Sequence, residues 1–270
     1  MFVTRFAPSP TGLLHLGHAF SALTAHDAAR AASGRFLLRI EDIDQGRARP
    51  AFEAALIEDL SWLGVRWDAP PRRQSDHMAD YAGALARLIA QGAVYRCFRT
   101  RKEILAAMAG APHGSGEVFF GARLGPDDEA ERLTRGEMFA WRLDAARARD
   151  QLGPLFFDDE TGRVAVDPLR LGDAVVARKD FPASYHLASV WDDARDGVTH
   201  VIRGADLRDS AHLHVVLQSL LGLPTPRYAH HRLIVDEAGK RLAKRDSART
   251  LRSLRDGGKT PANIRAMVGL

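Results

Sequence analysis

The first 42 residues set the strongest limit on the fold of this chain. The stretch "MFVTRFAP" alternates, is rich in residues that favour strands, and predicts a short strand that ends at Pro8. A turn is predicted at "SPTG", an apolar stripe at helical spacing covers residues 13–30, and "RFLLRIED" predicts a buried strand. A strand, a helix and a second strand within about 40 residues are typical of a crossover in a parallel sheet. The sequence therefore predicts an α/β fold.

The middle of the chain departs from this pattern. Helices are predicted at "RPAFEAALIEDLSWLG" and "MADYAGALARLIAQG", each ended by a glycine. Next, "RCFRTRKEILAAMAG" indicates a helix, "APHGSGEVFFGARLGPDDE" a loop, and "MFAWRLDAAR" and "PLFFDDETGRVAVDP" hairpins. The α/β pattern resumes with "DFPASYHLASVWDDARDGVTHVIRGADL", a helix and a strand that ends at Arg203 and Gly204. We therefore expect an insertion between two halves of one α/β domain, and two small helices in the tail.

Composition excludes several classes of protein. With 46% hydrophobic and 27% charged residues, the chain has the composition of a globular protein. No apolar run reaches the roughly 18 residues of a membrane span, and the N-terminus lacks the features of a secretory signal. The single cysteine cannot form an internal disulfide. We therefore expect a cytoplasmic protein that does not act at a membrane. Its net charge of +4 fits an RNA partner, although a diffuse arginine excess is also typical of a GC-rich genome.

His15 and His18 stand at the N-terminal end of the first predicted helix, where backbone N–H groups favour phosphate. Two imidazoles three residues apart share one helix face and can donate hydrogen bonds to an anion. Gly17 between them would let a flat ring approach the backbone. The stretch is not a P-loop, because no GxxxxGK[ST] occurs. From these residues alone, surface histidines or half of a zinc site are open alternatives.

Five motifs in a fixed order resemble class I aminoacyl-tRNA synthetases of the glutamyl/glutaminyl branch. They are "RFAPSPTGLLHLGHA", "LLRIEDID", "SYHLASVWDD", "VIRGADL" and "GKRLAKRDS", which together span most of the chain. The resemblance implies a Rossmann-like catalytic domain, a parallel sheet with helices on both faces, in two halves at residues 1–94 and 176–235. An α+β, acceptor-binding-like insertion would occupy residues 95–175. Residues 236–270 would hold the counterpart of the family's KMSKS loop and a short helical tail, with no anticodon-binding domain.

In that family, a glutamate carboxylate attacks the α-phosphorus of ATP and pyrophosphate leaves. The resemblance implies that His15, His18 and Lys244 are catalytic, and that Gly17 and Arg241 bind ATP with them. The imidazole donors would match the charge that builds on the α-phosphate in the transition state. The KMSKS-like loop departs from the family pattern, because Arg241 replaces its first lysine and Ala243 its serine. Mg²⁺ is expected with ATP, held largely by phosphate oxygens and water.

The resemblance also implies a pocket for L-glutamate. Its residues would be Arg5, Ala7, Ser9, Glu41, Tyr185 and Arg203. Free glutamate has two carboxylates and one ammonium group, so guanidinium donors and one acidic acceptor suit it. Arg5 and Arg203 are predicted at strand ends, where α/β sheets hold their ligands. The family often has asparagine where this chain has Ser189, and we expect Asp42 and Asp44 to be structural.

Zinc is not expected. Many short members of the family bind zinc through Cys-x-Cys, a tyrosine and a later cysteine in the insertion. This chain keeps Cys97, but Arg99 replaces the second cysteine and no other cysteine exists. His113 with Cys97 would supply only half a site. We therefore predict no metal site.

About 25 residues follow the basic loop, too few for the helical anticodon-binding part of a longer member. The resemblance therefore implies the short branch that attaches glutamate to queuosine in tRNA(Asp). The expected partners are L-glutamate and the anticodon stem-loop of tRNA(Asp), bound by a monomer. The alternatives are a truncated core that charges tRNA(Glu), a non-catalytic synthetase-like module that binds RNA, and a nucleotidyltransferase with another substrate.

Overall fold

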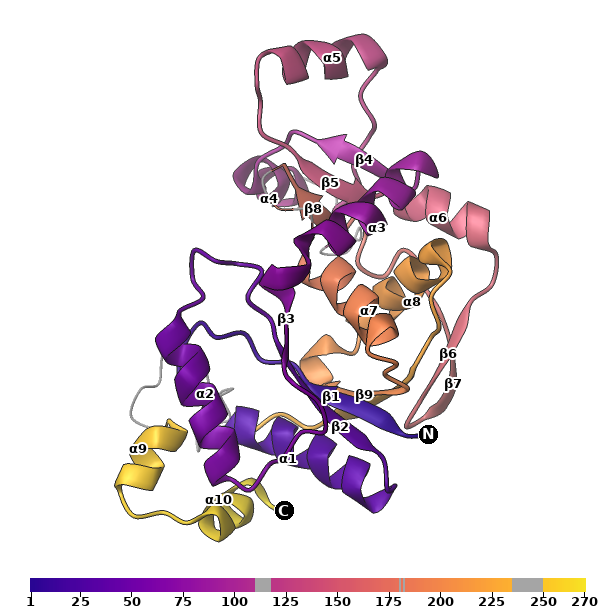
Figure 1. The fold of residues 1–270 in the computed structure, drawn as a ribbon. Helices are drawn as coiled ribbons and strands as arrows, with labels where there is room; N and C mark the ends of the chain where they lie inside the picture. The colour runs from indigo at the N-terminus through magenta and orange to yellow at the C-terminus, as the bar shows by residue number, and fades with distance from the viewer. Residues whose placement is uncertain (110–117, 180, 182, 235–249) are drawn as a thin grey trace.

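A computed structural model confirms the parallel α/β architecture. It describes residues 1–109, 118–179, 181, 183–234 and 250–270. One parallel sheet has the order β1-β2-β3 and consists of β1 (Val3–Phe6), β2 (Arg35–Ile40) and β3 (Arg72–Arg73). A second pairs β9 (His200–Gly204) with β10 (Arg227–His231) in parallel. The N–H of Thr199 donates to the carbonyl oxygen of Val3 at 2.9 Å, so the start of β9 is joined to β1 (Figure 1).

Helices cover both faces of these sheets. They are α1 (Leu16–Ala31), α2 (Pro50–Trp62), α3 (Met78–Ala90), α7 (Tyr185–Arg195) and α8 (Ser210–Leu221), with 3-10 turns η1 (Gln74–His77) and η2 (Ala205–Leu207). Successive side chains of a strand point to opposite faces. Phe36 and Leu38 accordingly share a core cluster with α1, whereas Leu37 packs in another with Val215 of α8. Because β1, β2, β9 and β10 pair in parallel within their sheets, the carboxyl ends of each pair meet at one edge.

Residues 94–178 build a separate antiparallel sheet in the order β4-β5-β8. Its strands are β4 (Val94–Cys97), β5 (Ala140–Leu143) and β8 (Val175–Arg178), and its helices are α4 (Arg101–Ala109), α5 (Pro126–Thr134) and α6 (Ala145–Leu152). In Figure 1 this part stands above the parallel sheets, with α5 farthest from them. The change from parallel to antiparallel pairing separates it from the rest of the fold.

Three local predictions in this part are wrong. The helix expected from Arg96 begins only at Arg101, because residues 94–97 pair with β5 instead. The stretch "MFAWRLDAAR" is not a hairpin, since β5 pairs with β4 and β8 and is followed by α6. The carboxylate of Asp144 starts α6 by accepting the N–H of Arg147 at 3.0 Å. The expected loop ends early at α5, whose first turn holds Pro126 and three acidic residues that favour a helix N-terminus.

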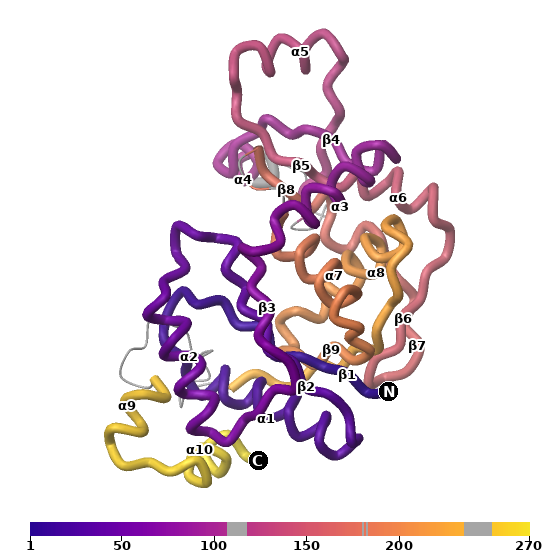
Figure 2. The backbone as a smooth tube through the Cα atoms, in the orientation of Figure 1, coloured from indigo at the N-terminus to yellow at the C-terminus, as the bar shows by residue number. Residues whose placement is uncertain are grey.

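A hairpin formed by β6 (Phe156–Asp159) and β7 (Gly162–Ala165) confirms the hairpin predicted at "PLFFDDETGRVAVDP". The backbone runs from α6 through this hairpin to the side of the parallel sheets where the N-terminus lies (Figure 2). There β6 lies beside β10. The turn of the hairpin thus reaches the strand that ends at His231.

The described C-terminal residues form the two small helices that were predicted, α9 (Leu251–Asp256) and α10 (Pro261–Val268). Leu251, Ile264 and Val268 are buried in the core cluster that also contains α1. Arg265 donates to the carboxylate of Asp27 on α1 at 2.7 Å. Among the helices described, none combines the length and the apolar character that crossing a membrane requires.

Candidate active site

A cavity of about 300 Å³ lies at the carboxyl ends of β1, β2, β9 and β10. Nine of the eleven predicted site residues line it: Arg5, Ala7, Ser9, His15, Gly17, His18, Glu41, Tyr185 and Arg203. The other two, Arg241 and Lys244, lie outside the described residues, as does Ala243. Residues predicted for ATP and residues predicted for glutamate therefore share one cavity.

His15 and His18 form the start of α1 itself. Nδ1 of His15 accepts the N–H of Gly17 at 3.1 Å, and Nδ1 of His18 accepts the N–H of His15 at 3.2 Å. Each neutral ring therefore carries its proton on Nε2. The ring centroids lie 3.9 Å apart, and a Cβ atom on Gly17 would come within 3.0 Å of the His15 ring. The glycine thus makes room for two adjacent, mutually tilted imidazole rings beside the helix N-terminus.

Arg5 is fixed by a buried carboxylate that sequence analysis missed. Nε of Arg5 donates to Oδ1 of Asp193 at 2.9 Å, and Nη1 of Arg39 donates to the same oxygen at 2.6 Å. Burial alone would raise the pKa of Asp193, but Arg5 and Arg39 outweigh it and hold that pKa below its usual range. Asp193 belongs to "SVWDD", 188 residues from Arg5 along the chain, and no local pattern indicates the contact.

Glu41 directly follows β2 and lines the cavity. Its Oε1 accepts from Nη2 of Arg39 at 3.2 Å, and the residue is 9% exposed. Burial raises the pKa of Glu41, although Arg39 and Arg5 oppose the shift. An ammonium group in the cavity would therefore give this buried carboxylate a further ionic partner.

Arg203 lies at the end of β9 and is held differently. Its Nε donates to Nε2 of His230 at 3.3 Å, and its Nη1 donates to Nδ1 of His214 at 3.1 Å. Its Nη2 is buried and has no hydrogen-bond partner among the described residues. Burial and the nearby Arg203 lower the pKa of His230 to about 4, and the same causes lower the pKa of His214 well below its usual value. Both imidazoles are therefore neutral, and sequence analysis missed both.

A second cavity of about 560 Å³ adjoins the first, and Ser9, Glu41 and Tyr185 line both. Its other walls come from the loop after β2 and from the start of α7, with Val175 and Arg178 of β8. Arg47 also lines it. Basic side chains from two parts of the fold thus line a space that shares three wall residues with the first cavity.

The remaining sequence predictions fall beside the cavities. Asp42 accepts the N–H and the hydroxyl of Ser75 at 2.8 and 2.6 Å, as a structural residue does. Asp44 accepts from Nε of Arg47 at 2.6 Å and also lines the second cavity. Ser189 is buried and accepts from Nη2 of Arg39 at 3.4 Å. Cys97 is buried beside Tyr95 and Ile104, and His113 lies outside the described residues.

Comparison with known proteins identifies the family of the chain. The model of class I tRNA synthetases (E and Q), catalytic domain, matches residues 1–270. The chain belongs to this family. A glutamyl-Q tRNA(Asp) synthetase of Rhodobacter capsulatus is 49% identical over 99% of this chain and 100% of its own length. A glutamyl-Q tRNA(Asp) synthetase of Symbiobacterium thermophilum is 42% identical over 98% of this chain and 84% of its own.

Solved structures agree with this family membership. The glutamate-tRNA synthetase of Elizabethkingia anophelis superposes with a TM-score of 0.76 at 31% identity, over 91% of this chain and 53% of that protein. The chain therefore spans about half the length of that solved structure. The Rossmann-like synthetase fold predicted from the five motifs is confirmed by the family match and this superposition.

Proposed function

We propose that this chain, acting as a cytoplasmic monomer, activates L-glutamate with ATP and transfers it to the queuosine base in the anticodon stem-loop of tRNA(Asp). One observation carries the proposal. Donors suited to phosphate and charges suited to a dicarboxylic amino acid line the same cavity. The name of the R. capsulatus relative, which this chain matches over that relative's whole length, supports the choice of acceptor.

The amino acid would bind between Arg5, Arg203 and Glu41. Guanidinium groups suit its two carboxylates, and Nη2 of Arg203 is a buried donor that has no partner among the described residues. Glu41 suits the ammonium group, and Tyr185, which also lines the cavity, carries a hydroxyl that could bind the substrate. The backbone after β1, at Ala7 and Ser9, would close the pocket against the substrate main chain. Together these groups would hold the reacting carboxylate in one orientation.

His15 and His18 would donate from Nε2 to the α-phosphate of ATP as charge builds there. This side of the cavity offers hydrogen-bond donors and a helix N-terminus, which fit a polyphosphate. Because Mg²⁺ binds the phosphates of ATP, it would enter with the nucleotide and be held mainly by phosphate oxygens and water.

We assign Arg241 and Lys244 to the triphosphate by family resemblance. The described residues on either side of their segment support this. Ile234 lines the cavity, and Thr250 forms a β-bridge with His15.

The second cavity would receive the acceptor nucleoside. Because Ser9, Glu41 and Tyr185 line both cavities, an acceptor hydroxyl there would lie next to the activated carboxyl group. Arg47 and Arg178 offer positive charge to the phosphates of a stem-loop.

The decisive experiment is charging with labelled glutamate and ATP. Its substrates are purified tRNA(Asp) with queuosine, tRNA(Asp) without it, and tRNA(Glu). We expect label only on the tRNA that contains queuosine, and we expect the ester to survive removal of the 3′-terminal adenosine. Label on tRNA(Glu) that is lost with that adenosine would instead support a conventional glutamyl-tRNA synthetase core. A wild-type chain that shows no glutamate-dependent ATP–pyrophosphate exchange under any condition would contradict both enzymatic proposals and favour the non-catalytic module that binds RNA.

A further inference from the structure

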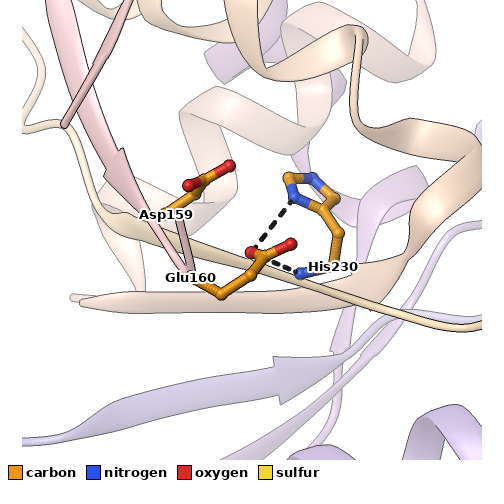
Figure 3. A group of neighbouring side chains, drawn as sticks. All are labelled: Asp159, Glu160 and His230. Atoms are coloured by element: carbon orange, nitrogen blue, oxygen red, sulfur yellow. Dashed lines mark hydrogen bonds and ion pairs between the residues drawn. The ribbon is translucent and has the colours of Figure 1, made fainter. Parts of the chain in front are cut away.

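The turn of the β6–β7 hairpin places Glu160 against β10, next to the strand that carries Arg203. An oxygen of Glu160 accepts the backbone N–H of His230 at 3.1 Å, and the same oxygen lies 3.8 Å from Nδ1 of that ring (Figure 3). The His230 side chain is fully buried, and Nδ1 has no hydrogen-bond partner among the described residues. The hairpin therefore places a carboxylate at the Nδ1 edge of the His230 ring, while Arg203 lies at its Nε2 edge.

Asp159, Glu160 and His230 lie close enough to share a metal ion, since their ligand atoms are within 4.8 Å of one another. Arg208 already forms an ion pair with each of the two carboxylates. Its Nη1 donates to Oδ2 of Asp159 at 2.9 Å, and its Nη2 contacts Oε1 of Glu160. A cation at this point would compete with a guanidinium group and would lie near Arg203 as well. These ion pairs therefore favour a structural role for the three residues over metal binding.

The hydrogen bonds fix which nitrogen of each ring carries the proton. A guanidinium group only donates, so Nε2 of His230 and Nδ1 of His214 must both accept from Arg203. His230 therefore carries its proton on Nδ1, facing Glu160, and His214 carries its proton on Nε2. That second proton can be donated to Nδ1 of His186, 3.1 Å away. Both rings thus depend on a neighbour for the correct tautomer.

This arrangement has an electrostatic consequence for Arg203. Arg5 and Arg39 both contact the carboxylate of Asp193, and Glu41, Asp192 and Asp196 lie within 4.0 Å of Arg39. Both hydrogen-bond partners of Arg203 among the described residues are uncharged rings, so its positive charge is not balanced by them. Glutamate has a net charge of −1, and one of its carboxylates at Nη2 would give Arg203 the anionic partner that the two rings do not supply.

We propose, on the basis of the function proposed above, that His214 and His230 are positioning residues for the amino acid. They orient Arg203 with two neutral acceptors and leave Nη2 and its charge for a carboxylate of the substrate. Glu160 supports this by holding the proton of His230 on Nδ1. The hairpin that follows the antiparallel part of the fold would thereby take part in amino-acid binding.

A crossed pair of substitutions tests this at each ring. The amide oxygen of asparagine can reach the position of Nδ1, whereas that of glutamine reaches the position of Nε2. His214→Asn and His230→Gln should therefore keep the acceptor for Arg203, and their KM for glutamate should stay within about threefold of the wild-type value. His214→Gln and His230→Asn misplace it, and their KM for glutamate should rise about tenfold or more.

The readout is ATP–pyrophosphate exchange, with glutamate binding measured by calorimetry. KM for ATP should change by less than about twofold in all four variants, because the nucleotide side is untouched. Glu160→Gln keeps an acceptor for the His230 N–H and removes the charge, so a smaller rise of about threefold in KM for glutamate is expected. His212→Gln is the matched control, since His212 lies on α8 beside Phe157 and outside both cavities.

Equal losses in both members of each crossed pair would overturn the positioning role, because a merely structural ring would not distinguish Nδ1 from Nε2. Zn²⁺ binding that is abolished by Asp159→Asn would also overturn it, in favour of a metal site. A failure of the proposed function is distinguishable from both results. In that case the wild-type chain itself would show no glutamate-dependent exchange.

Discussion

Arg5 and Arg203 occupy equivalent places at the ends of β1 and β9, and both are 4% exposed, yet their surroundings differ. Arg5 donates to Asp193, a carboxylate that also binds Arg39. Arg203 donates to two neutral imidazoles and keeps Nη2 without a partner among the described residues. The first environment satisfies a buried charge within the protein. The second leaves a buried charge that a ligand can satisfy.

These two environments can serve different purposes, one stabilising the fold around the cavity and the other binding a ligand. A buried guanidinium group is costly unless it is paired and hydrogen-bonded. Asp193 supplies that pairing from α7 and ties the helix to both β1 and β2. His214 and His230 supply orientation without neutralising Arg203. A substrate carboxylate would thus bind a guanidinium group that is already desolvated and oriented.

The largest effect is expected where the paired environment loses its carboxylate. Asp193→Asn would leave Arg5 without a carboxylate partner among the described residues, while Arg39 would keep Glu41, Asp192 and Asp196 nearby. We expect the free energy of unfolding to fall by about 3–5 kcal/mol, measured by urea denaturation at pH 7.5. Asp158→Asn is the control, because Asp158 is exposed, and should change it by less than about 0.5 kcal/mol. Equal stability of the two variants would refute the structural role of Asp193.

Arg203→Ala should act on binding instead of folding. The substrate carboxylate would lose a charge-assisted partner, so kcat/KM for glutamate in ATP–pyrophosphate exchange should fall by the equivalent of about 2–5 kcal/mol. Arg227→Ala, at the exposed start of β10, should leave exchange unchanged. Near wild-type activity of Arg203→Ala would show that the pocket is assigned incorrectly.

Asp59 on α2 offers a contrast to Asp193, because this buried carboxylate lacks a close partner. Neither oxygen has a hydrogen-bond partner among the described residues, and Arg255 comes only to 3.7 Å. Burial raises the pKa of Asp59 to about 6, against an ordinary value of 3.8. Below about pH 4 the Asp59 carboxyl group is protonated in both the folded and the unfolded chain. As pH rises from 4 to 6 it ionises mainly in the unfolded chain, so the free energy of unfolding falls.

Asp59→Asn cannot ionise and should escape this loss. Between pH 4 and pH 7, the stability of the variant should therefore gain on the wild type by about 2 kcal/mol, after allowance for solvent screening. Chemical denaturation at several pH values measures this difference. A difference that stays constant across the range would mean that Asp59 is ionised normally in the folded chain.

The smallest effect is expected at the nucleotide side, where His18→Ala removes one neutral donor. Its Nε2–H should matter most as charge builds on the α-phosphate, so kcat should fall by the equivalent of about 1–2 kcal/mol. KM for ATP should change less, and steady-state exchange kinetics separate the two quantities. If kcat and ATP affinity fall equally, this donor contributes to ground-state binding only.

Local sequence patterns predicted the parts of this molecule that depend on neighbouring residues. The crossover from β1 to β2 is predictable because its strand and helix periodicities lie within 42 residues, and His15 and His18 together form the N-terminal capping box of α1. The family resemblance named nine residues that the fold brings to one cavity. The roles of these residues, and the boundaries of the insertion at residues 95–175, stay predictions.

Long-range contacts could not be predicted in the same way. Asp193 meets Arg5 across 188 residues, and Glu160 meets His230 across 70, with no periodic pattern to indicate either contact. His230 lies in "RYAHHRLIVDEAGKRLAKRD", a stretch that predicts only a strand or hairpin followed by a basic loop. Likewise, β4 and β5 pair across the whole of α4 and α5, so their antiparallel register depends on tertiary packing. Orientation of the site residues is therefore a property of the fold.

A crystal structure of this chain with bound L-glutamate would show which atoms of Arg203 the substrate contacts. We predict that an oxygen of one substrate carboxylate lies within hydrogen-bond distance of Nη2 of Arg203. Nε and Nη1 of Arg203 should keep their contacts with His230 and His214, and the substrate ammonium group should face Glu41. Glutamate bound elsewhere, with that Nη2 atom still unpaired, would contradict the account.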